Sequence, residues 1–206
     1  MGKVFLDISM SLDGYVAGLH DSLDSGLGEG GIRLHEWIWG ASAPGSIMGE
    51  GLTKADKEAF DQIFGELLER TGAIVTGRRT YELSKGWGGS HPVNGAPVFV
   101  LSKDVPKRIP KGKSTFTFVS DGIASAVRQA RSAAGDRDVY VMGGANVAQQ
   151  SLTAGLLDEI RIHLVPVLLG AGIRLFDHLE SISQVLQKVA TIDAPLATHF
   201  AFRVVK

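Results

Sequence analysis

Short apolar segments alternate with helical segments along most of the chain, and this alternation limits the possible folds more than any other sequence feature. Strand-like runs cover residues 4–10, 73–76, 97–101 and 138–142, and apolar residues at helical spacing follow several of them. Strands that alternate with helices usually form a parallel sheet, because the helix returns the chain to the same edge. The sequence therefore predicts an α/β fold with a largely parallel centre.

Local start and stop signals place the helices. Thr53-Lys54-Ala55-Asp56 is a capping box, and the helix that follows is expected to end at Gly72. Asp121 is expected to cap another helix, which Gly135 ends. Residues 34–39 predict a short helix, and the glycine-rich residues 20–31 predict a loop.

The C-terminal part of the chain contains few helical signals. Ile160, Ile162 and Leu164 alternate in a strand that is interrupted near Pro166, and residues 185–190 and 199–205 predict a closing hairpin. Such strands are expected at an antiparallel edge of the sheet. Since the sequence has no internal repeat, linker or low-complexity tract, we expect one domain over residues 1–206.

Composition excludes several classes of protein. With 44% apolar and 21% charged residues the chain is not of the disordered type, and a formal net charge of −1 creates no field that attracts nucleic acid or an anionic membrane. The longest apolar run, Leu164–Leu169, is too short to cross a bilayer, and Asp7 interrupts the start where a signal peptide needs an apolar core. The absence of cysteine excludes disulfides and thiolate zinc sites and fits a cytoplasmic location.

Three predicted strands each end in residues that suit a phosphate group. Gly143-Gly144 separates a strand from a helix, where glycines let an anion reach the free N–H groups of the helix. Gly77-Arg78-Arg79-Thr80 follows a second strand, and Ser102-Lys103 ends a third; guanidinium groups bind phosphate oxygens in pairs. Each motif alone also fits a tight turn or a solvated surface. Because α/β sheets bind ligands at the carboxyl ends of their strands, the convergence of three motifs favours a nucleotide site.

The sequence does not match the residue spacing of other known nucleotide-binding, hydrolase or metal-site motifs. The glycine turn does not match the G-x-G-x-x-G pattern, and Gly112-Lys113-Ser114 lacks the upstream glycine of a phosphate-binding loop, because Lys107 stands there. The chain has no G-x-S-x-G nucleophile elbow. The six histidines are scattered and form no H-E-x-x-H pair, so no metal site is expected.

The same motifs resemble the dihydrofolate-reductase superfamily in order and spacing. The resemblance is carried by Thr76–Glu82, Phe99–Ser102 and Val141–Val147. Ser11-Leu12-Asp13-Gly14 and Leu164–Gly170 resemble one branch more closely, namely the C-terminal reductase domain of the bifunctional riboflavin-biosynthesis deaminase/reductase and its stand-alone relatives. The resemblance implies a dihydrofolate-reductase-like α/β fold, with a mixed, mostly parallel central sheet, flanking helices and an antiparallel C-terminal edge.

By the same resemblance the cofactor is NADPH. Arg78, Ser102 and Lys103 would hold the adenosine 2′-phosphate, and Arg79 and Thr80 would contact the phosphates at a helix start. The remaining implied cofactor contacts are Gly77, Met142, Gly143, Gly144, Ala145, Asn146 and Val147. Folate enzymes often carry an arginine where this chain has Asn146, so one charged contact would be missing.

The sequence indicates the catalytic and substrate-binding residues less clearly than the cofactor-binding residues. Folate reductases place an acidic residue on the helix after the first loop, where this chain offers Glu36 and His35; Asp13 is a third candidate catalytic residue. Arg33 and Trp37 are candidate substrate contacts, and all five also fit surface or core positions.

The resemblance implies an NADPH-dependent reductase of a small heterocyclic substrate, acting on CH–OH or CH–NH groups and comparable to 5-amino-6-(5-phosphoribosylamino)uracil reductase. A dihydrofolate reductase and a non-catalytic nucleotide- or drug-binding protein of the same fold are the alternatives. The apolar strand region from Ile160 to Val205 supplies more edge surface than one small sheet buries, so we also expect a homodimer.

Overall fold

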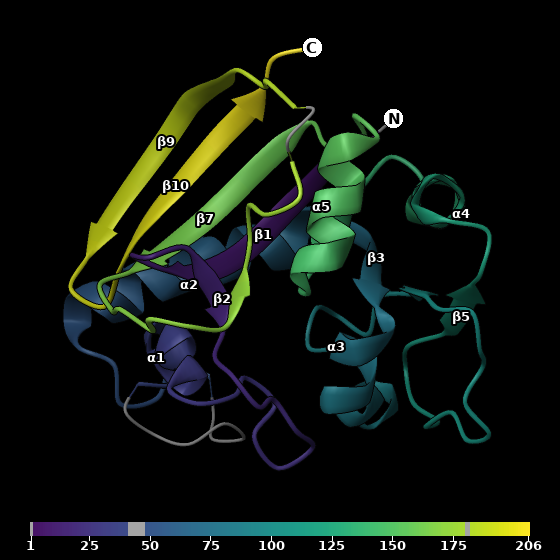
Figure 1. Cartoon of the computed structure of the whole chain (residues 1–206), viewed down its shortest axis with the longest axis horizontal. Helices are drawn as coiled ribbons and strands as arrows, with labels where there is room; N and C mark the ends of the chain where they lie inside the picture. The colour runs from purple at the N-terminus through teal and green to yellow at the C-terminus, as the bar shows by residue number, and fades with distance from the viewer. Residues whose placement is uncertain (1, 41–47, 180–181) are drawn as a thin grey trace.

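An eight-stranded mixed sheet forms the centre of the molecule in the computed structural model, which describes residues 2–40, 48–179 and 182–206 (Figure 1). In chain order the strands are β1 (Val4–Ser11), β3 (Thr71–Gly77), β4 (Val98–Leu101), β5 (Phe116–Val119), β6 (Asp138–Met142), β7 (Glu159–Val165), β9 (Leu186–Ala194) and β10 (Ala197–Val204). Across the sheet their order is β5-β4-β3-β6-β1-β7-β10-β9. The first six strands in this order are parallel, β10 runs antiparallel to β7, and β9 at the edge runs antiparallel to β10. The predicted sheet is confirmed, including its antiparallel C-terminal edge.

Helices cover both faces of this sheet. α2 (Lys54–Arg70) packs against one face, whereas α4 (Ile123–Ala134) and α5 (Ala145–Thr153) pack against the other, with α5 in front of β1 in Figure 1. Two short elements, η1 (Gly31–His35) and α1 (Glu36–Trp39), stand where the sequence predicts one short helix, and α3 (Arg78–Leu83) and η2 (Lys85–Gly89) follow β3. β2 (Tyr15–Ala17) does not extend the main sheet but pairs with β8 (Ile173–Arg174).

The alternation of side chains along β1 decides which residues face which helices. Val4 and Leu6 belong to the apolar cluster that includes α4 and α5, whereas Phe5 belongs to the cluster that includes Leu67 of α2. Because successive side chains point to opposite faces, Asp7 and Ser9 lie on the α2 side with Phe5. Both are buried, so β1 carries two polar side chains into the interior.

Two predicted helix boundaries are wrong, and each has a physical reason. Gly72 does not end α2 but lies within β3, where a Cβ atom would come 2.8 Å from Ala134 of α4, so close packing requires the glycine. Asp121 does not cap α4, whose N-cap is Gly122 without a side-chain cap. Within the described residues, no helix is long and apolar enough to cross a lipid bilayer.

Candidate functional site

The three phosphate-type motifs follow three neighbouring strands. β3 lies between β4 and β6, and the register places Gly77 beside Leu101 and Thr76 beside Met142. Ser102-Lys103, Gly77-Arg78 and Gly143-Gly144 therefore leave the sheet at adjacent points of the same edge. The structure brings the motifs together as the sequence predicts.

The glycine turn after β6 forms an open backbone cradle. Gly143 and Gly144 have φ values of 54° and 79°, in the left-handed region that favours glycine. A Cβ atom at either position would lie 3.2 Å from the side chain of Thr80, so the turn and the start of α3 are in close contact. Gly144 is the N-cap of α5 and no side chain caps this helix, which leaves its first N–H groups free for an anion.

The two arginines after β3 are hydrogen-bonded to carboxylates. Arg78 donates from Nε to Glu82 and from Nη1 to Asp104, each at 2.7 Å, and these hydrogen bonds raise its pKa. Arg79 donates from Nε to the carboxylate of Asp21 at 2.9 Å and from Nη2 to the carbonyl of Asp21 at 2.7 Å, which raises its pKa as well. Both arginines are about half exposed, so these pairs are weak and a ligand anion can replace the carboxylates.

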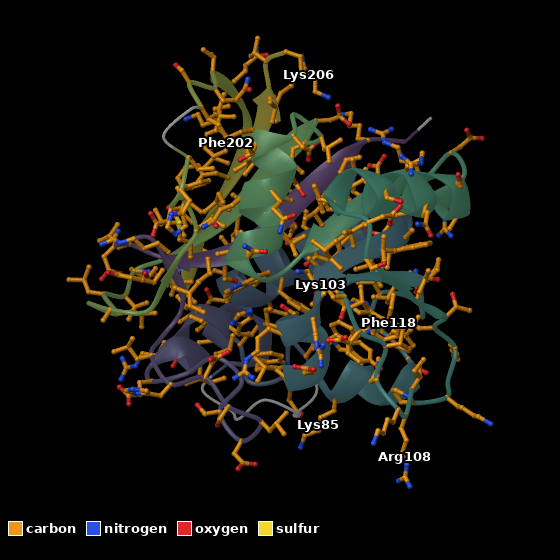
Figure 2. The ribbon with its side chains drawn as sticks, turned by 45° about the vertical axis from the view of Figure 1, so that its right-hand side comes forward. Lys85, Lys103, Arg108, Phe118, Phe202 and Lys206 are labelled. Atoms are coloured by element: carbon orange, nitrogen blue, oxygen red, sulfur yellow. The ribbon has the colours of Figure 1, made fainter. Side chains whose placement is uncertain are left out.

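The turn after β4 completes this group of charges. The hydroxyl of Ser102 donates to the carbonyl of Asp104 at 2.7 Å and accepts from the N–H of Asp104 at 3.2 Å, so it closes the turn. Lys103 is exposed and is labelled in Figure 2. The open cradle, the uncapped helix and the nearby cations together fit the phosphates of a dinucleotide.

Asp13 is held in place by three hydrogen bonds. Its carboxylate accepts from the hydroxyl of Ser11 at 2.6 Å and from the N–H groups of Leu169 at 3.2 Å and Gly170 at 2.7 Å. These bonds, that of Ser11 above all, lower the pKa of Asp13 to about 2. Asp13 is therefore ionised near neutral pH, and it joins the end of β1 to the segment after β7 instead of donating a proton.

The other candidate catalytic residues lie where η1 meets α1. Nδ1 of His35 is buried and has no hydrogen-bond partner among the described residues. Burial, together with the charge of His163, lowers the pKa of His35 to about 4, so its imidazole is neutral near pH 7. Glu36 is half-buried and Arg33 is exposed, and the side chain of neither has a hydrogen bond or ion pair to another described residue.

A buried polar network that no sequence motif predicts lies on the α2 side of β1, β7 and β10. Oδ1 of Asp7 lies 2.8 Å from Nε2 of His163, and Nδ1 of His163 lies 2.8 Å from Nδ1 of His199. The indole of Trp37 packs against both imidazoles, with ring centroids 4.3 and 4.9 Å apart, and donates to the hydroxyl of Ser9 at 2.9 Å. Trp37, a predicted substrate contact, is therefore a buried member of this network.

The charges of the network follow from its surroundings. Burial acts to raise the pKa of Asp7, but the charge and hydrogen bond of His163 and the charges of Arg161 and Arg70 outweigh it, so the pKa lies below its usual value. Burial and the charge of His163 lower the pKa of His199 to about 3. Asp7 is therefore an ionised carboxylate, and His199 is neutral near pH 7.

The network lies beside the glycine turn. The register of β1 with β6 places Asp7 next to Met142, the residue before Gly143, and the hydroxyl of Tyr140 donates to the carbonyl of Asp7 at 3.3 Å. In the part of the chain that the structure describes, no three histidine or acidic side chains are arranged to hold a metal ion. A carboxylate between Leu6 and Ile8 in a buried strand is the one sequence signal that points to this network.

Known proteins share this fold. The chain is similar to a candidate riboflavin biosynthesis protein from Shewanella sp. PV-4, with a TM-score of 0.68, 24% identity and 99% of each chain covered. It is also similar to dihydrofolate reductase from Enterococcus faecalis in complex with NADP(H), with a TM-score of 0.58, 14% identity, and 100% of this chain and 98% of that chain covered.

Sequence comparison assigns the family. The uncharacterized protein YyaP of Bacillus subtilis is 25% identical over 186 residues, which cover 84% of this chain and 80% of YyaP. The family model of the RibD C-terminal domain matches residues 2–196, within which all three strand-end motifs lie. The chain therefore belongs to the RibD C-terminal domain family.

Proposed function

We propose that this protein is an NADPH-dependent reductase that passes a hydride to a small heterocyclic substrate. One observation carries the proposal: three adjacent strands of a RibD C-terminal domain end in cationic or hydroxyl side chains and in an open glycine turn before an uncapped helix. Oxidoreductase chemistry fits the family, and NADP(H) is bound by a similar fold, the Enterococcus faecalis dihydrofolate reductase.

In this proposal, different residues of the chain bind different parts of the cofactor. Bound NADPH supplies the hydride, and the chain supplies its orientation. The N–H groups at the start of α5 bind the pyrophosphate, together with Arg79 and Thr80. Arg78 and Lys103 bind the 2′-phosphate, for which Arg78 exchanges its carboxylate partners.

Fewer residues remain as candidate proton donors than the sequence alone implies. Asp13 is ionised and His35 is neutral near pH 7, so Asp13 has no proton to donate and His35 lacks the acidic proton of an imidazolium. Glu36 and water remain as donors in this proposal. The reaction class comparable to this one is that of 5-amino-6-(5-phosphoribosylamino)uracil reductase, an activity in the name of a similar protein from Thermotoga maritima.

Steady NADPH oxidation with a panel of pyrimidines, quinones and dihydrofolate tests the proposal. We expect turnover with a heterocycle other than dihydrofolate. Tight NADPH binding without turnover of any acceptor would favour the non-catalytic binding protein, and rapid turnover of dihydrofolate would favour the folate enzyme. Failure to bind NADPH would refute the proposal.

The edge of the sheet supports a homodimer as part of the proposal. Val185, Leu186 and Val189, at or next to β9, are 67%, 38% and 47% exposed, and Phe202 on β10, labelled in Figure 2, is half-buried. An exposed apolar edge strand favours pairing with a second copy. The lack of cysteine supports a cytoplasmic location.

A further inference from the structure

Asp7 has one carboxylate oxygen that the protein leaves without a partner. Oδ1 is bonded to His163, whereas Oδ2 is buried and has no hydrogen-bond donor among the described residues. A buried carboxylate oxygen that has lost its water gains stability only when a donor binds it. The buried Asp56 shows the usual solution, because its Oδ1 accepts from the N–H of Leu196 at 2.9 Å and its Oδ2 accepts from the hydroxyl of Thr53 at 2.5 Å.

The two arginines whose charges lower the pKa of Asp7, Arg161 and Arg70, do not bind its Oδ2. Arg161 donates to Glu159 at 2.7 Å and to Glu66, and Arg70 donates to Glu159 at 2.8 Å and to Asp138 at 2.7 Å. Both guanidinium groups are therefore already satisfied by carboxylates. Asp7 remains a negative group with one free acceptor.

The network behind Asp7 holds this acceptor in a defined place. His163 binds Oδ1, His199 binds His163, and the indole of Trp37 packs against both rings. All three aromatic side chains are buried, with exposures of 3%, 5% and 7%. A carboxylate fixed in this way presents Oδ2 in one orientation, which is how a binding site is preorganised.

The position of Asp7 connects it to the proposed cofactor site. Asp7 pairs with Met142 in the sheet, and Gly143-Gly144 follows directly. A group bound to Oδ2 therefore lies beside the turn to which the proposed function assigns the cofactor.

We propose that Asp7 is a specificity-determining residue whose Oδ2 binds an N–H group of the substrate. An ionised carboxylate only accepts hydrogen bonds, so the ligand must donate. A carbonyl compound without a donor, or a phosphate, would be repelled at this oxygen. This inference rests on the proposed function and names a residue that selects its substrate.

Binding of 2-aminopyridine, compared with 2-methylpyridine, tests the inference without turnover. The two probes have similar size, but only the first donates N–H bonds. In wild-type protein, 2-aminopyridine is expected to shift the NMR signals of the Trp37 indole N–H and the His163 imidazole in a saturable way, whereas 2-methylpyridine is not. Asp7→Asn is expected to weaken 2-aminopyridine by about tenfold or more, the loss of one hydrogen bond to a charged group. Asp56→Asn, which changes a buried carboxylate with both oxygens bonded, should leave the binding of this probe unchanged.

Each result decides for or against the inference. Equal shifts with both probes, no saturable binding of 2-aminopyridine, or unchanged affinity in Asp7→Asn would overturn it. If Asp7→Asn does not fold, the comparison of the two probes on wild-type protein, with intermolecular nuclear Overhauser effects to Trp37, decides alone. NADPH binding, followed at the amides of Gly143 and Gly144, is measured separately. If the wild-type protein does not bind NADPH but binds 2-aminopyridine and not 2-methylpyridine, the proposed function is refuted and this inference is not.

Discussion

Gly143→Ala tests the glycine turn on which the cofactor site depends. Gly143 has a φ of 54°, and an alanine Cβ there would lie 3.2 Å from Cγ2 of Thr80. Gly155→Ala is the matched control, because Gly155 has a φ of 63° at the other end of α5 and its Cβ would meet no atom within 4 Å. Both variants introduce the same backbone strain, but only one places a methyl group in the cradle.

The expected magnitudes follow from these contacts. An L-residue in the left-handed region costs about 1–2 kcal/mol, of which the stiffer unfolded chain of an alanine variant offsets about 0.4–1 kcal/mol. Gly155→Ala should therefore lower the free energy of unfolding by about 1 kcal/mol or less. Gly143→Ala adds the contact with Thr80, which raises the loss to about 2 kcal/mol.

Cofactor binding separates the two variants more sharply. A hydrogen bond to a charged group contributes roughly 1.5–3 kcal/mol, so loss of one N–H contact to a phosphate weakens NADPH by about 10- to 150-fold. Gly155→Ala should bind NADPH like the wild type. Titration calorimetry gives the affinities, and urea unfolding gives the stabilities.

A double variant distinguishes the steric contact from the binding effect. Thr80→Ser removes Cγ2, so in Gly143→Ala/Thr80→Ser we expect part of the stability to return while NADPH binding stays weak. If Gly143→Ala bound NADPH as tightly as Gly155→Ala, the glycine turn would not hold the cofactor and the proposed site would be wrong.

Three further predictions concern charge and assembly. Arg78→Ala should weaken NADPH by about tenfold and leave NADH unchanged, whereas Arg79→Ala should weaken both; equal losses in Arg78→Ala would show that the 2′-phosphate binds elsewhere. Burial opposes ionisation of Glu159, but hydrogen bonds from two arginines outweigh it and lower its pKa from 4.5 to about 2, so its contribution to stability is complete above pH 4.5 and is lost as the pH falls towards 2. Urea unfolding over this pH range should show a smaller pH dependence in Glu159→Gln, and an unchanged slope would contradict this assignment. Light scattering should give twice the chain mass of 21.9 kDa, with Val189→Lys shifting the protein to monomer; a wild-type monomer at micromolar concentration would count against the dimer.

Local patterns in the sequence determine most of the elements and the place of the phosphate-type motifs. The strand Asp138–Met142 and the end of α4 at Gly135 follow from apolar runs and glycine signals that are complete within a few residues. The motifs after β3, β4 and β6 could be placed at one edge because parallel strands all end on the same side of a sheet.

Tertiary structure alone decides which distant residues meet. His163 and His199 are 36 residues apart, and only the antiparallel register of β7 with β10 places their Nδ1 atoms 2.8 Å from each other. Gly72 carries a helix-stop signal, yet the approach of Ala134 from α4 makes it part of a strand. Periodicity tells which side of its own element a residue faces, but the element opposite is set by long-range packing, so the network at Asp7 could not be read from the sequence.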